Sequence, residues 1–163
     1  MPKCLFFTCP TDCLEHTINA TFTYENYFYN SLGNSFIYDG KTIENIWQIV
    51  KKHAIEEIYF VLSIDNRIVL DALGDAKFST IGTLSNFYRD IKRQSKCSNT
   101  LYQGDTSKFS ILSYFLNKKI KEFENTNVSK LPIKVGGKIY DRNQNTFGII
   151  YSNLVCLEEY HLN

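Results

Sequence analysis

The stretch Ile58–Leu73, IYFVLSIDNRIVLDAL, decides the fold of this chain. It begins as a continuous apolar run, breaks at Ser63–Arg67, and resumes with apolar residues at helical spacing. A continuous apolar strand is typical of a parallel sheet that is covered on both faces. Parallel α/β proteins bind ligands where the carboxyl end of a strand meets the next helix. The break therefore predicts both a fold class and the place of a site.

Short apolar or aromatic runs on either side of this stretch predict further strands. The expected strands are Leu5–Thr8, Tyr27–Leu32, Glu57–Leu62, Ile133–Val135, Lys138–Tyr140 and Phe147–Tyr151, with a polar turn at 141–145. The order strand, helix, strand around the third of these implies a right-handed parallel crossover. We therefore expect a mainly parallel sheet that ends in a carboxyl-terminal strand or hairpin.

Apolar residues at helical spacing predict the helices between these strands. The expected helices begin at Cys13 with Asp12 as cap, run from the cap Thr42 to His53, and cover Ile68–Leu73, Leu84–Ile91 and Phe109–Phe123. The polar segment Lys96–Thr106 is expected to be a loop. Together the pattern indicates one α/β domain over residues 1–163, with helices flanking the sheet.

Size and composition are those of one ordinary globular domain. The chain has 163 residues, 44% hydrophobic and 21% charged, which excludes a disordered protein and a membrane protein. Its formal net charge of +1 gives no overall attraction to nucleic acid or to anionic lipid. The first apolar run is too short for a signal peptide or a membrane span, so we expect a cytoplasmic protein. Five cysteines, an odd number, favour free thiols.

Four landmarks fall at the ends of the expected strands. They are TCPTDC around Cys9, NSLGN at Asn30–Asn34, SIDNR at Ser63–Arg67 and GGKIYDRNQNTF at Gly136–Phe147. In order and spacing the chain resembles a degraded β-class carbonic anhydrase, whose strands end in Cys-x-Asp-x-Arg, Arg-Asn-Ala-Gly-Asn and His-x-x-Cys. The resemblance implies that fold, and a homodimer with the active cleft at its interface.

Members of that family hold zinc with the first Cys and the His-x-x-Cys pair. Cys9 matches the first ligand, but Ser63 stands at the His position and Asn66 at the second Cys position. Asp12 lies one residue later than the motif's Asp, and Cys13 stands near the motif's Arg. Zinc needs thiolate, imidazole or carboxylate ligands. We therefore expect no metal or other cofactor in the family site, and no hydration of carbon dioxide.

The leading hypothesis is a carbonic-anhydrase-like protein that keeps a cleft for a small polar or anionic ligand. The residues expected to line it are Cys9, Asp12, Asn34, Ser63, Asp65, Asn66 and Arg67. Backbone N–H groups and the guanidinium at 65–67 suit a carboxylate or phosphate. The same residues suit a structural role, with Asp65 or Asn66 capping a helix and Arg67 pairing with Asp65 or Asp71.

Two alternatives stay open. Cys9, Cys13 and His16 have the spacing of a shifted zinc site, which would make the chain an active zinc lyase. In the competing interpretation, both thiols are buried for packing and His16 lies on a helix surface. In a further hypothesis, Cys9 is a nucleophile. Alternatively, the chain is a structural or interaction protein that acts through its dimer surface. The acids Glu122 and Glu124 directly follow the basic run Lys118–Lys121, so we expect a solvated helix face there and no nucleic-acid partner.

Overall fold

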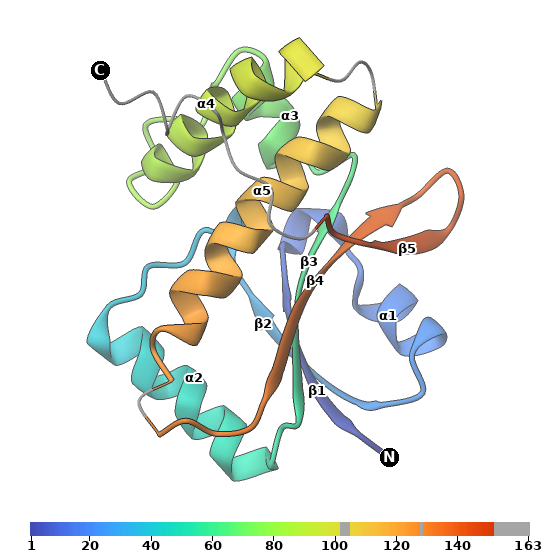
Figure 1. Cartoon of the computed structure of the whole chain (residues 1–163), viewed down its shortest axis with the longest axis vertical. Helices are drawn as coiled ribbons and strands as arrows, with labels where there is room; N and C mark the ends of the chain where they lie inside the picture. Colours follow the sequence, from blue (N-terminus) through green and yellow to red (C-terminus); the bar gives the residue numbers. More distant parts are fainter. Residues whose placement is uncertain (102–104, 128, 152–163) are drawn as a thin grey trace.

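A five-stranded sheet forms the centre of the molecule (Figure 1). The structure, a computed structural model, describes residues 1–101, 105–127 and 129–151. The strands are β1 Lys3–Thr8, β2 Glu25–Asn30, β3 Glu57–Ser63, β4 Lys134–Asp141 and β5 Thr146–Ile149, in the spatial order β2-β1-β3-β4-β5. The first four run parallel, and β5 pairs antiparallel with β4. This arrangement confirms the predicted mainly parallel α/β fold with a carboxyl-terminal hairpin.

Helices flank the sheet (Figure 1). They are the 3-10 turns η1 Pro10–Asp12 and η2 Leu32–Asn34, and the helices α1 Glu15–Thr21, α2 Gly40–His53, α3 Arg67–Leu73, α4 Ser85–Leu101 and α5 Asp105–Glu124. In the described part of the chain, none of these helices combines the length and the apolar composition that crossing a membrane requires.

Side chains that alternate along β1 and β3 fill two separate cores. On one face, the rings of Phe7 and Phe60 stack with their centroids 4.5 Å apart, and Phe123 of α5 packs against both. On the other face, Phe6 stacks on Tyr59 at 5.7 Å in a smaller cluster that includes residues beside and within α1. Both faces of the central strands are therefore covered, as their continuous apolar sequence predicts.

The predicted strand boundaries need two corrections. Strand β2 covers Glu25–Asn30, two residues earlier than predicted. Strand β4 continues through Gly136 and Gly137, where the sequence predicted an interruption. Both glycines serve packing, because a Cβ on Gly137 would lie 2.6 Å from Cδ1 of Ile150, and one on Gly136 would press on Tyr59. Glycine therefore marks close contacts inside this strand rather than its end.

The caps predicted for the first two helices were also wrong. The carboxylate of Asp39, not Thr42, caps α2, accepting from the Thr42 backbone N–H at 2.7 Å. Asp12 ends the 3-10 turn η1, and α1 begins later, at Glu15, with Leu14 at the cap position. The Asp12 carboxylate instead accepts hydrogen bonds from Ser63 at the end of β3 and from Asn66 before α3. Both donors lie far away in the sequence, so a local pattern does not reveal them.

The predicted loop at Lys96–Thr106 was wrong as well. Helix α4 runs to Leu101 and α5 begins at Asp105, while residues 102–104 lie outside the described part. Helix α4 packs against α3 and α5 and buries Phe87, Tyr88 and Ile91. This packing holds the start of the helix, so the polar residues that follow can continue it.

Burial of the aromatic core predicts a large stability effect at Phe7. This side chain is fully buried, whereas Phe78 is 46% exposed. We expect Phe7→Ala to lower the free energy of unfolding by about 3–5 kcal/mol, through lost burial and a cavity. The matched change Phe78→Ala should cost about 0.5 kcal/mol or less. Urea unfolding measures both, and equal losses would contradict this description of the core.

Candidate functional site

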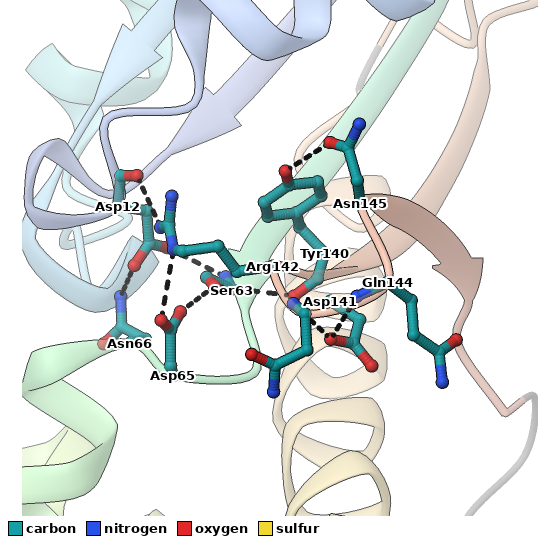
Figure 2. A network of polar contacts seen from close by, with 10 residues as sticks. Asp12, Ser63, Asp65, Asn66, Tyr140, Asp141, Arg142, Gln144 and Asn145 are labelled. Atoms are coloured by element: carbon teal, nitrogen blue, oxygen red, sulfur yellow. Dashed lines mark hydrogen bonds and ion pairs between the residues drawn. The ribbon is translucent and has the colours of Figure 1, made fainter.

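Polar side chains from three strand ends meet at one edge of the sheet, which we call the strand-end site (Figure 2). Asp12 follows β1, Ser63 ends β3, Asp65 and Asn66 follow it, and Arg142 follows β4. The structure brings together four of the seven residues predicted from the sequence, Asp12, Ser63, Asp65 and Asn66. Arg142 was not predicted.

Asp12 lies at the centre of this site and is only 2% exposed. Its carboxylate accepts hydrogen bonds from the Ser63 backbone N–H at 2.9 Å and from Asn66 Nδ2 at 2.8 Å. Burial raises the pKa of Asp12 from its ordinary 3.8 to about 6, although both hydrogen bonds favour the charged form. One carboxylate thus ties β1 to β3 and to the start of α3.

Asn66 is committed at both ends of its amide. Its Nδ2 donates to Asp12, and its Oδ1 accepts from the Val69 backbone N–H at 2.9 Å, which caps α3. This confirms the structural interpretation of Asn66 as a helix cap. The position that would carry a zinc-binding cysteine in a carbonic anhydrase therefore holds a side chain that joins two parts of the protein.

Ser63 and Arg142 both bind Asp65. The Ser63 hydroxyl donates to one carboxylate oxygen of Asp65, and Arg142 Nε lies 3.1 Å from the other. Burial alone would raise the pKa of Asp65, but the bonds from Ser63 and Arg142 hold it below its ordinary value. Arg142 Nη2 also donates to the Asp12 carbonyl oxygen at 3.0 Å. Arg142 therefore closes the site from the side of β4.

The turn after β4 fixes the position of Arg142 (Figure 2). The Asp141 carboxylate accepts from the backbone N–H groups of Asn143 and Gln144, at 2.9 and 3.2 Å. The Tyr140 hydroxyl donates to Asn145 Oδ1 at 2.7 Å. The sequence predicted this polar turn. Because the turn directly follows a parallel strand, its position was the signal that could have identified Arg142 as a site residue.

Arg67 does not have the partners predicted for it. Its side chain is exposed and makes no hydrogen bond or ion pair within the described residues. Asp65 pairs with Arg142 instead, and Asp71 accepts from the Tyr88 hydroxyl and from two backbone N–H groups after α3. The predicted pairing of Arg67 with either acid was therefore wrong.

Cys9 and Asn34 lie next to each other beside the Asp12 network. The buried Cys9 sulfur accepts from the Gly33 backbone N–H at 3.1 Å and lies 3.1 Å from the Thr11 hydroxyl. Asn34 is fully buried and donates to the Val61 carbonyl oxygen at 2.9 Å. Its Oδ1 meets no donor in the described part of the chain. These two side chains line the core side of the strand ends.

Among the described residues, the side chains at the strand ends do not match the ligand set of a zinc ion. Cys13 is exposed rather than buried and points its thiol at the Pro10 carbonyl oxygen, 3.5 Å away, and His16 is exposed on α1. Over residues 1–101, 105–127 and 129–151, no three His, Cys, Asp or Glu side chains gather where they could hold a metal. Ser63 and Asn66 offer a hydroxyl and an amide that are already engaged. The structure therefore provides one thiol and one buried carboxylate, which fall short of a zinc site.

Three cavities lined by described residues lie away from the predicted ligand residues. Their volumes are about 500, 530 and 320 Å³. The first lies between the chain before α2 and helices α4 and α5, the second beside α4, and the third beside β4. None of the three is lined by any of the seven predicted residues, and ligand binding at the strand ends stays a prediction.

The raised pKa of Asp12 predicts a pH dependence of stability. Because the pKa is higher in the folded chain, Asp12 favours the folded state most below pH 3.8, and this contribution is lost as the pH rises through about 6. We expect the free energy of unfolding of Asp12→Asn to lack this fall, so that the difference between wild type and variant changes as the pH rises from 3.8 through about 6. Urea unfolding across that interval measures it, with exposed Asp75→Asn as the control. An unchanged pH dependence in Asp12→Asn would show that another group titrates.

Comparisons with known proteins support a fold but not an activity. No protein-family model matches the chain. A segment of 86 residues, 53% of the chain, is 35% identical to the 120.7 kDa protein in the NOF-FB transposable element of Drosophila melanogaster. The match spans only 8% of the length of that much larger protein.

Solved structures with the same fold cover nearly the whole chain. The β-carbonic anhydrase CafD of Aspergillus fumigatus is 14% identical, with a TM-score of 0.73 over 93% of this chain and 90% of that one. A tetrameric β-carbonic anhydrase of Sordaria macrospora is 16% identical, with a TM-score of 0.69 over 91% and 80%. A Coccomyxa enzyme in complex with acetazolamide is 13% identical, with a TM-score of 0.68 over 97% and 76%. This chain therefore has the β-carbonic anhydrase fold, in a divergent sequence.

Proposed function

We propose that this chain is a carbonic-anhydrase-like protein without the family's zinc ion and without hydration of carbon dioxide. The observation that carries the proposal is the Asn66 side chain. It donates to Asp12 and caps α3 at the position where the resemblance places a zinc-binding cysteine. A carboxamide is not an ordinary zinc ligand. Binding a metal there would also break two buried hydrogen bonds.

The remaining polar groups favour the same conclusion. Ser63, at the position of the zinc-binding histidine, donates to Asp65, and Asp65 is paired with Arg142. Hydrogen bonds within the chain thus compensate the charges at the strand ends. A buried polar network of this kind is stable without a metal as long as its members keep their partners.

We further propose that the solvent side of the strand-end site binds a small polar or anionic ligand. Asp65 and Arg67 precede and follow Asn66 in the chain and are both exposed, and the Arg142 side chain is 46% exposed. Of the two guanidinium groups, that of Arg67 has no partner within the described residues. A guanidinium binds a carboxylate or phosphate through two parallel hydrogen bonds. The more deeply buried groups, Asp12 and Asn66, then hold the strand ends in place.

The alternative of a zinc lyase that uses Cys9, Cys13 and His16 lacks support from the geometry. Cys9 is buried and accepts from Gly33, whereas Cys13 and His16 face solvent. Three ligands must converge within about 2.0–2.3 Å of one zinc ion. One buried and two exposed side chains do not make such a cluster here.

A role as an interaction module is the second candidate function. The likeness to one segment of a much larger transposable-element protein favours this role. There the similar segment is one part of a long chain, as interaction modules often are. Solved proteins with this fold include tetrameric enzymes, which supports the proposal that this chain forms an oligomer such as a homodimer. A cytoplasmic location is a proposal that rests on the sequence alone. Light scattering that finds a monomer at all concentrations would remove the dimer surface as the functional feature.

The absence of zinc is tested by measuring metal content against protein concentration, in protein expressed with zinc available and never chelated. We expect far less than one zinc per chain, and no hydration of carbon dioxide above the buffer rate. The double variant Ser63→His/Asn66→Cys restores two of the family's ligands beside Cys9 and serves as the positive control. Zinc bound stoichiometrically by the wild type, and lost in Cys9→Ser, would overturn the proposal.

The ligand site is tested with bicarbonate as the probe, followed by chemical shifts of backbone amides. We expect saturable shifts near residues 65–68 in the wild type, and binding about tenfold weaker in Arg67→Gln, because a charged hydrogen bond is lost. Lys41→Gln removes one exposed charge elsewhere and should bind as the wild type does. Equal affinities in all three proteins would remove Arg67 from the site.

A further inference from the structure

Helix α4 presents four cationic residues to one cavity. Arg89, Lys92, Arg93 and Lys96 line a space of about 530 Å³ beside the helix, which we call the α4 cavity. Its other lining residues are Ser79, Ser85 and Tyr88. We propose that the α4 cavity binds a small ligand that carries adjacent phosphate groups, such as a diphosphate.

The spacing of the four cations places them on one face of the helix. They occupy positions i, i+3, i+4 and i+7, so successive members lie within one turn of one another. The only acid between Arg89 and Lys96 is Asp90, and its carboxylate lies 2.8 Å from Lys118 Nζ on α5. The cationic face thus has no acid of its own within this segment. Like charges at this spacing oppose the helix, and a bound anion relieves that repulsion.

Two described acids, in α3 and shortly after it, have partners within the chain. Asp71 accepts from the Tyr88 hydroxyl and from the backbone N–H groups of Lys77 and Phe78. Asp75 lies 3.8 Å from Lys77 Nζ. Neither carboxylate lines the α4 cavity. The described lining therefore contains four cations and no acid. Arg93 and Lys96 have further interactions, so the argument depends on Arg89 and Lys92, whose two charges favour an anion with more than one negative charge.

The other lining groups add hydroxyl donors and a rigid wall. Ser79 and Ser85 contribute hydroxyl groups, which commonly bind phosphate oxygens. Tyr88 is buried and its hydroxyl is held by Asp71 at 2.5 Å, so this side of the cavity is fixed. Arg89 donates to the neutral Asn86 Oδ1 at 2.7 Å and keeps its other N–H groups for a ligand.

The size of the cavity favours a small ligand over a nucleic acid. Its volume lies in the range of about 300–1,000 Å³ that small-molecule sites occupy. The chain as a whole has a net charge of only +1, which gives little long-range attraction for a polyanion. The four cations instead span about 10 Å along the helix, at 1.5 Å per residue. That length suits two or three linked phosphate groups.

The α4 cavity is separate from the strand-end site. None of Asp12, Ser63, Asp65, Asn66 or Arg142 lines it. A substitution that abolishes ligand binding at one site therefore leaves binding at the other site measurable. Arg93 and Lys96 make further interactions of their own, so the test concerns Arg89 and Lys92.

The test is a calorimetric titration of the full chain with sodium pyrophosphate at constant ionic strength. We expect saturable binding of one pyrophosphate per chain. Arg89→Gln/Lys92→Gln should bind at least about tenfold more weakly, because two charge-assisted hydrogen bonds are lost. The matched control is Lys51→Gln/Lys52→Gln, which removes two exposed lysines from α2 and should bind as the wild type does.

The outcomes separate this proposal from its competitors. The substituted residues of both double variants are exposed. The single variants Arg89→Gln and Lys92→Gln test the loss of pyrophosphate binding with less disturbance of α4. No saturable binding to the wild type, or an equal loss in both double variants, would overturn the proposal. A single-stranded DNA oligonucleotide that binds where pyrophosphate does not would replace the small ligand with a nucleic acid.

Discussion

The buried carboxylate of Asp12 is the interaction on which the strand ends depend. Taking a carboxylate out of water is costly unless hydrogen bonds compensate it. Here the compensation comes from the backbone of Ser63 and the side chain of Asn66, so a single group joins β1, β3 and α3. Arg142 extends the connection to β4 through Asp65 and the Asp12 carbonyl oxygen. Substitution of Asp12 or Asn66 leaves a buried polar group without its partner.

This network lies at the strand ends where the resemblance to carbonic anhydrases places a metal site. A zinc centre draws its ligands from several strand ends and holds them in a fixed arrangement. In this chain hydrogen bonds connect these strand ends. The Asn66 side chain caps α3, and Asp65 forms an ion pair with Arg142. We propose that the fold is kept while the Lewis-acid chemistry is lost. In that proposal a ligand binds the outer side of the site, where Arg67 and Arg142 are exposed together with Asp65.

The two proposed binding regions have different origins in the fold. The strand-end site exists because parallel strands bring their carboxyl ends to one edge of the sheet. The α4 cavity instead depends on how one helix is packed, since α4 buries its apolar side against α3 and α5 and turns four cations outward. The same packing explains why α4 continues through a polar segment. A stable apolar face permits the other face to carry charge that would weaken an isolated helix.

Local sequence predicted the strands, most helices and a helix cap at Asp65 or Asn66, because apolar spacing and capping act over a few residues. The resemblance to a family, rather than local sequence, implied that Ser63 and Asn66 stand at positions of metal ligands. Only the tertiary structure decided the partners: Arg142 reaches Asp65 across 77 positions, and Asn66 reaches Asp12 across 54. The same reason explains the failed pairing of Arg67. Contacts between distant segments are set by the packing of strands and helices, which a local pattern does not record.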